Sequence, residues 1–252
     1  MPSEWKKMLQ VNRSDDHRVI ALFAAGSVDI TPVSARHVAS VFYMPVSNER
    51  ETTLVCAMVL SDEERQRAGC FAAESDRTNF IQRRAFRRYC GAKTLGDLRQ
   101  LSEITFSETD NGRPYLQERP DCWFSFSSCS TGFLGAWSAS HGIGVDIENQ
   151  TGQIEAVEMA SHFFSKAEAE VVERHTGTDR KQAFFHFWCL KEAALKSIGE
   201  GLPVGLNAFE FKLSPEPHVV RTPAPDGGSK RFTAHLISRG TDCAALITRT
   251  LV

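Results

Sequence analysis

The sequence lacks a long hydrophobic run. Its apolar stretch near the N-terminus, residues 19–25, is far too short to span a bilayer. The four residues before that stretch, Asp15, Asp16, His17 and Arg18, do not form the basic leader of a secretion signal. We therefore expect a cytoplasmic protein that has no membrane partner.

The seven cysteines include no Cys-x-x-Cys pair, and their number is odd. A disulfide framework needs an even set, and a structural zinc site needs closely paired ligands. Neither kind of site is expected, and free thiols suit a reducing cytoplasm.

An excess of charge of one sign is also missing. Lysine and arginine number 29 against 31 for aspartate and glutamate, so the net charge is −2. Nucleic-acid-binding proteins usually carry a basic field, and we expect no nucleic-acid partner. Four arginines do crowd one stretch, which is typical of a solvated helix face: Arg83, Arg84, Arg87 and Arg88.

The same order of elements occurs twice in the chain. Ser-x-x-Glu capping boxes begin at Ser61 and Ser165, and each predicts the start of a helix. A longer helix follows each box, over residues 75–92 in the first copy and from Asp179 in the second. The matching order indicates an internal duplication.

Strand-like segments surround these helices without regular alternation. They lie at residues 19–25, 37–43, 53–60, 104–106, 123–126, 133–138, 144–148, 208–213, 231–237 and 243–248. This pattern predicts an α+β fold of two pseudo-equivalent halves, each a small, mainly antiparallel sheet packed with a long helix. A ligand cleft is expected between the halves. We place an N-terminal extension of unassigned role at residues 1–50, an N-terminal half at 51–140 and a C-terminal half at 141–252.

Two carboxylates alternate along one of these strands. Asp146 and Glu148 are two residues apart, so both project from one face while Val145 and Ile147 point into the core. Paired carboxylates repel each other, and a divalent cation such as Mg²⁺ relieves the repulsion. Taken alone, the pattern also fits an amphipathic strand with an acidic solvent face.

A second polar group interrupts the apolar helix at residues 184–197. Glu192 and Lys196 are four residues apart, and Lys191 adds a second cation. A surface ion pair is the simple explanation. However, the neighbouring aromatic residues pull the helix towards the core, and a partly buried glutamate beside lysines is typical of a metal and phosphate site.

Asp-x-Glu on a strand, followed about forty residues later by Trp-x-x-Lys-Glu-Ala-x-x-Lys on a helix, resembles the signature of the 4′-phosphopantetheinyl transferases. The likeness is to the larger, monomeric, two-half (Sfp-like) type. It extends upstream through Asn-Gly-Arg-Pro at residues 111–114 and the first capping box, and it covers roughly residues 52–250.

The resemblance implies that Asp146, Glu148 and Glu192 surround one Mg²⁺, which also holds the pyrophosphate of coenzyme A. It implies that Lys196 contacts the phosphates, that Lys191 is its basic neighbour, and that Glu168 is a further acid near the metal. Glu192, Lys196 and Glu168 are thus the candidate catalytic residues. Further contacts to coenzyme A are implied at Arg67, Arg77, Thr78, Arg113, Ser127 and Ser128.

The chain departs from the family pattern along one strand. Ser125 replaces an asparagine, Ser128 a histidine that helps to hold a phosphate of coenzyme A, and Cys129 a serine. Loss of one charge-assisted hydrogen bond is expected to weaken the affinity for coenzyme A by one to two decades, or about 1.5–3 kcal/mol.

The activity implied is transfer of 4′-phosphopantetheine from coenzyme A to a serine of an acyl or peptidyl carrier protein, with release of 3′,5′-ADP. Glu192 is then either a metal ligand or the base that takes the serine proton. The arginines at 83–88 are a candidate surface for an acidic carrier protein. Two alternatives stay open: a non-catalytic relative that binds coenzyme A or a carrier protein, and a metal-dependent phosphohydrolase.

Overall fold

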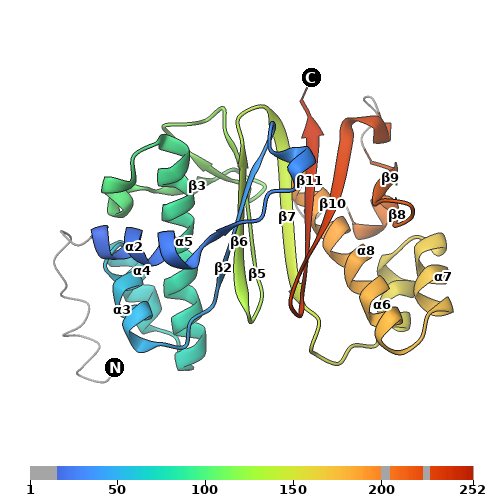
Figure 1. Cartoon of the computed structure of the whole chain (residues 1–252), viewed down its shortest axis with the longest axis horizontal. Helices are drawn as coiled ribbons and strands as arrows, with labels where there is room; N and C mark the ends of the chain where they lie inside the picture. Colours follow the sequence, from blue (N-terminus) through green and yellow to red (C-terminus); the bar gives the residue numbers. More distant parts are fainter. Residues whose placement is uncertain (1–15, 200–204, 224–227, 252) are drawn as a thin grey trace.

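The computed structural model describes residues 16–199, 205–223 and 228–251. Two antiparallel sheets lie in the middle, with α5 and its neighbouring helices on one side and α8, α6 and α7 on the other (Figure 1). The predicted α+β fold of two similar halves is confirmed. None of the described helices has the length and the apolar content that crossing a membrane requires.

The N-terminal half is a four-stranded sheet, in the order β1-β2-β6-β5, packed with helices α2 to α5. Its strands are β1 (Val28–Asp29), β2 (Ser40–Pro45), β5 (Trp123–Ser128) and β6 (Gly132–Ser138), and a separate hairpin joins β3 (Phe106–Glu108) to β4 (Pro114–Leu116). Its helices are α2 (Asp16–Gly26), α3 (Arg50–Ala57), α4 (Asp62–Gly69) and α5 (Glu74–Leu95), with short 3-10 turns at Val33–Ala35 and Leu98–Glu103.

The C-terminal half is a three-stranded sheet, in the order β10-β11-β7, which packs against α8. Its strands are β7 (His141–Asn149), β10 (Phe232–Arg239) and β11 (Asp242–Thr250), and a small hairpin joins β8 (Glu210–Lys212) to β9 (His218–Arg221). Its helices are α6 (Ala156–Phe163), α7 (Lys166–Arg174) and α8 (Gly177–Ile198), with 3-10 turns at Leu206–Ala208 and Gly228–Arg231.

The capped helix followed by a longer helix recurs as predicted. Ser61 caps α4 and Ser165 caps α7, each through a complete capping box. The long helices that follow, α5 and α8, both have 22 residues. Each ends at a left-handed glycine, Gly96 at φ 73° and Gly199 at φ 70°, a conformation that side chains with a Cβ adopt at a cost.

Two strand predictions near the N-terminus are wrong. Residues 19–25 lie within helix α2, where Val19 and Phe23, four residues apart, are both fully buried on one face. Residues 53–60 lie mostly within helix α3 and the turn that follows it. A short continuous apolar run has no periodicity that separates a buried strand from a buried helix.

The two halves share a core where their sheets face each other. Val41, Leu134 and Ala136 of the first sheet pack against Val145 and Leu246 of the second. The edge strands β5 and β7 also meet, since the Val145 amide donates to the Ser125 hydroxyl at 3.0 Å. The relative position of the two halves is therefore fixed by both apolar packing and hydrogen bonds.

A buried polar cluster closes one end of this interface. Asp242, 3% exposed, accepts hydrogen bonds from Thr131 at 2.6 Å, from Asn149 at 2.8 Å and from the Tyr43 hydroxyl at 3.3 Å. Burial, followed by the charge of Asp242, raises the pKa of Tyr43 to about 12. Tyr43 and Thr131 come from the N-terminal half, so this carboxylate ties the halves together.

Candidate active site

One face of β7 is built to receive helix α8. Gly142, Gly144, Asp146 and Glu148 alternate on that face, while Ile143, Val145 and Ile147 fill the core between the sheets. A Cβ on Gly144 would lie 1.8 Å from the Ala193 carbonyl oxygen, so the helix backbone rests directly on the strand. This close approach brings the polar residues of α8 beside the carboxylates of β7.

Asp146 lies at the centre of a polar group that spans both halves. Its Oδ1 accepts from the Lys196 ammonium at 2.7 Å and from the Ser127 hydroxyl at 2.8 Å, and Lys196 also lies 3.3 Å from Ser127. Asp146 is 4% exposed, and its Oδ2 is buried without a hydrogen-bond partner in the described part of the chain. A buried carboxylate oxygen of this kind is a favourable ligand for a cation.

Two further carboxylates border Asp146. Burial, followed by the charge of Asp146, raises the pKa of Glu148 to about 7, and the same two causes raise the pKa of Glu192. Lys196 opposes both shifts. The three acids repel one another in a partly desolvated place, which a divalent cation would relieve. As the side chains stand, no three His, Cys, Asp or Glu residues of the described ranges are grouped closely enough to hold a metal.

Glu192 and Lys196 line a pocket of about 250 Å³ between the halves, which we call the cleft pocket. Its other walls are Arg87 of α5, the β3–β4 turn at Asn111, Gly112, Arg113 and Pro114, the β5 residues Phe124, Ser125 and Phe126, and Leu195. The Arg113 guanidinium lies 4.2 Å from the centroid of the Trp123 ring, and burial lowers its pKa. The structure therefore brings Arg113, Glu192 and Lys196 together around one cavity.

Glu168 and Lys191 lie in a different place from the cleft pocket. The Lys191 ammonium contacts Glu168 at 2.7 Å, the Phe209 carbonyl at 2.6 Å and the Leu206 carbonyl at 3.1 Å. Its three N–H donors are thus all used, and the residue is fully buried. In contrast to the sequence expectation, Lys191 has no donor left for a phosphate, and Glu168 is held by Lys191 and by the amides of Ser165 and Phe211.

Breaking this pair is expected to destabilise the fold without changing the chemistry. Lys191→Met leaves the Glu168 carboxylate unpaired at 1% exposure, and the free energy of unfolding should fall by about 3–5 kcal/mol. Urea unfolding measures the loss, and the double variant Lys191→Met/Glu168→Gln should recover part of it. A double variant that is stably folded but inactive would contradict this structural role.

Three of the implied coenzyme A contacts, Arg67, Arg77 and Thr78, are not in the described lining of the cleft pocket. Arg67 is exposed on α4, and Thr78 is half-buried on α5. Arg77 donates to the Ala68 carbonyl at 3.2 Å and to the Phe71 carbonyl at 2.7 Å, so it holds the end of α4 against α5. Their contact with a ligand stays a prediction.

The departures along β5 alternate between its faces. Ser125 and Ser127 face the C-terminal half, where they contact Val145 and Asp146. Cys129, just after β5, contacts Thr131 of the N-terminal half at 3.0 Å. Ser128 shares the opposite face with Phe126.

The sequence analysis missed Ser125 as a link to β7 and Arg87 as a wall of the cleft pocket. The alternation along β5 indicated which way Ser125 faces. The position of Arg87, in contrast, depends on its contact with the Phe126 ring of another element.

The model of the 4′-phosphopantetheinyl transferase superfamily matches residues 142–245, which include Asp146, Glu148, Glu192 and Lys196. A 4′-phosphopantetheinyl transferase of Bacillus subtilis is 28% identical over 75% of this chain and 80% of that protein. The 4′-phosphopantetheinyl transferase Sfp of Bacillus subtilis strain 168 is 32% identical over 61% of this chain and 72% of that protein. The chain belongs to the 4′-phosphopantetheinyl transferase superfamily. HetI of Nostoc, another 4′-phosphopantetheinyl transferase, is 28% identical over 66% of this chain and 70% of its own length.

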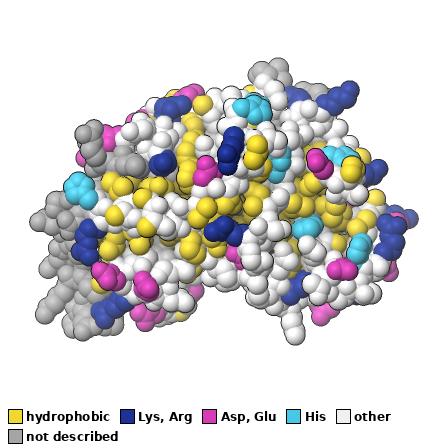
Figure 2. Space-filling model, in the orientation of Figure 1, with side chains coloured by type: hydrophobic (Ala, Val, Ile, Leu, Met, Phe, Trp, Pro, Cys, Tyr) yellow, Lys and Arg dark blue, Asp and Glu magenta, His cyan; other side chains and the backbone are white. Residues whose placement is uncertain are grey.

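Membership makes this protein a phosphopantetheinyl transferase. The surface of this transferase has no single-sign field on the face drawn in Figure 2, where acidic and basic side chains are interspersed around an apolar middle. The described lining of the cleft pocket includes three cations, Arg87, Arg113 and Lys196, and one carboxylate, Glu192.

Proposed function

We propose that this transferase moves 4′-phosphopantetheine from coenzyme A to a serine hydroxyl of an acyl or peptidyl carrier protein. The observation that carries the proposal is the cleft pocket between the halves, whose lining includes three cations and the Glu192 carboxylate, with Asp146 held by Lys196 beside it. Family membership and the names of the relatives support the acceptor class. In the step itself, the serine oxygen bonds to the β-phosphorus, and the bond from that phosphorus to the bridging oxygen breaks.

Asp146, Glu148 and Glu192 are the residues that would hold Mg²⁺. The buried, unpartnered Oδ2 of Asp146 and the raised pKa values of Glu148 and Glu192 support this ligand set. The chemistry that Mg²⁺ supplies when bound is charge neutralisation on the pyrophosphate and on the departing 3′,5′-ADP. Lys196, which is 2.7 Å from Asp146, and Arg113 border the same cavity and would bind phosphate oxygens.

Glu192 has two candidate roles that the same position supports. Half-buried on α8 and lining the cleft pocket, its carboxylate would either help to hold the metal or accept the proton of the attacking serine, directly or through water. Its raised pKa, caused by burial and by Asp146, makes it a better base than an exposed glutamate.

Intact-mass spectrometry tests the proposal directly. Apo carrier proteins are mixed with the transferase, coenzyme A and Mg²⁺, and we expect a gain of one phosphopantetheine mass on a carrier serine. The gain should vanish with EDTA and with Asp146→Ala. If no carrier is modified while coenzyme A still binds tightly, the protein is a non-catalytic binder. Hydrolysis of coenzyme A without any carrier would identify a phosphohydrolase.

A further inference from the structure

Arg87 lines two hollows of the described chain. One is the cleft pocket, and the other is a hollow of about 480 Å³ beside the start of α4, which we call the α4 pocket. Arg87 is the residue common to the described linings of both. Its side chain therefore borders both the cleft pocket and the α4 pocket.

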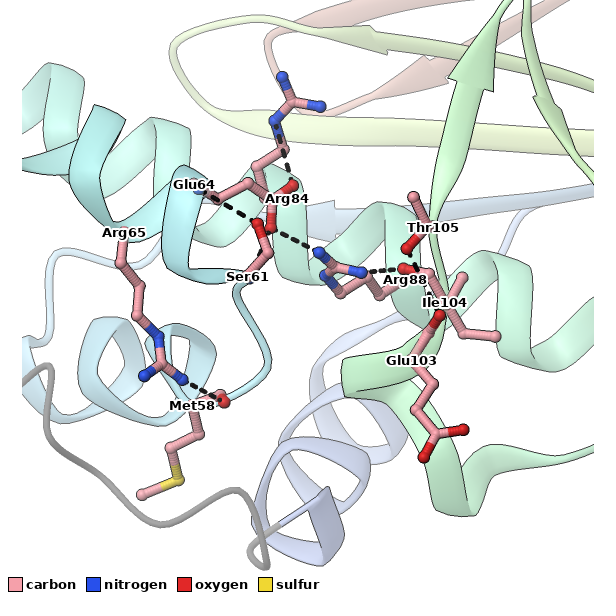
Figure 3. A network of polar contacts seen from close by, with 9 residues as sticks. All are labelled: Met58, Ser61, Glu64, Arg65, Arg84, Arg88, Glu103, Ile104 and Thr105. Carbon is pink, nitrogen blue, oxygen red and sulfur yellow. Dashed lines mark hydrogen bonds and ion pairs between the residues drawn. The ribbon is translucent and has the colours of Figure 1, made fainter.

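Two neighbouring arginines of α5, Arg84 and Arg88, share the carboxylate of Glu64. Glu64 lies 2.6 Å from Arg88 and 3.7 Å from Arg84, between the two guanidinium groups (Figure 3). Arg88 also donates to the Ile104 carbonyl. In the described ranges, Arg87 has no ion-pair partner, and its Nε is buried without a hydrogen bond. The arginine cluster is thus not a uniformly solvated face.

Arg87 lies over an aromatic ring and stays charged in spite of its burial. Its guanidinium lies 5.0 Å from the centroid of the Phe126 ring. Burial, followed by the charges of Arg84 and Arg83, lowers its pKa to about 10, so it remains protonated at neutral pH. A planar cation held on an aromatic ring presents its N–H donors along its edge, a geometry that suits phosphate oxygens.

Arg113 occupies a matching position across the cleft pocket. It too lies over an aromatic ring, that of Trp123, and its Nη1 is buried without a hydrogen bond among the described residues. With Lys196, the pocket holds three cations and one carboxylate, Glu192. Because Lys196 is paired with Asp146 at 2.7 Å, the guanidinium groups of Arg87 and Arg113 are the cations of this lining without an ion pair in the described ranges, and they favour an anionic ligand.

We propose that Arg87 binds a phosphate group of coenzyme A in the cleft pocket and sets the affinity of the transferase for this substrate. The inference rests on the proposed function. It also bears on the departure at Ser128, where a neutral hydroxyl replaces the family histidine. Arg87 packs on Phe126, which shares a face of β5 with Ser128, so Arg87 supplies a cation on that face.

Titration calorimetry with coenzyme A tests this role in the absence of a carrier protein. Arg87→Met is expected to raise the Kd of coenzyme A by about 10–100-fold, the loss of one hydrogen bond between charged groups. Arg87→Lys keeps the charge but loses the planar fork, so its Kd should lie between those of the wild type and Arg87→Met. In transfer assays, KM for coenzyme A should rise while kcat at saturating coenzyme A changes little.

Arg84→Met is the matched control, because it removes the same charge from the same helix, one turn away, and lines only the α4 pocket. Its Kd should stay within about twofold of the wild type, because the half-buried Arg84 lies outside the described lining of the cleft pocket and contacts Glu64. Unchanged binding by folded Arg87→Met, or an equal loss in Arg84→Met, overturns the inference while wild-type transfer stands. A wild-type protein that neither binds nor uses coenzyme A would overturn the proposed function as well.

Discussion

Replacing Glu192 by glutamine is expected to lower kcat for phosphopantetheine transfer by at least about 10²–10⁴-fold, the range for loss of a general base. Glutamine keeps the shape of the side chain but removes its charge and its basicity. Glu192 lines the cleft pocket and is close enough to Asp146 for each charge to affect the other. Either candidate role, metal ligand or base, therefore requires the carboxylate.

The dependence of the rate on Mg²⁺ separates the two roles. A metal ligand would give a variant that needs more Mg²⁺ for its residual rate, whereas a base would give one whose low rate does not respond to Mg²⁺. Asp179→Asn removes one carboxylate from the exposed first turn of the same helix and should leave transfer unchanged. Near-normal transfer by Glu192→Gln would refute both roles.

Local signals in the sequence were sufficient for much of the fold. Capping boxes depend on residues three apart, so Ser61 and Ser165 marked the starts of α4 and α7 without any tertiary information. The alternation around Asp146 placed both carboxylates of β7 on one face for the same reason. Features fixed by spacing along one element were thus predictable, including the repeated order of the two halves.

Features fixed by contacts between elements were not predictable. Lys191 and Lys196 are five residues apart on α8, so they point about 140° apart around the helix. Lys196 meets Asp146, and Lys191 meets Glu168 inside the C-terminal core. Helical spacing was a signal that separated these two lysines, but the importance of Arg87 depends on Phe126, which no spacing on α5 indicates.

Gly144→Ala is expected to have the largest effect on folding. The new Cβ would lie 1.8 Å from the Ala193 carbonyl oxygen, 2.8 Å from its carbonyl carbon and 2.6 Å from the Ser197 amide nitrogen. All three are backbone atoms of α8, so no side-chain rotation relieves the clash. The helix must lift from β7, and the free energy of unfolding should fall by more than about 3 kcal/mol. Urea unfolding followed by circular dichroism measures the loss.

Gly152→Ala is the matched control for this substitution. Gly152 is exposed just after β7, and nothing lies within 4 Å of its Cβ position, so the change should be neutral or slightly stabilising. Lifting α8 would also carry Glu192 and Lys196 away from Asp146, so any folded Gly144→Ala protein should lose transfer activity too. If Gly144→Ala unfolds at the same urea concentration as Gly152→Ala, α8 does not rest on β7 as described. The placement of the candidate active site would then be wrong as well, because the same contact brings its carboxylates and cations together.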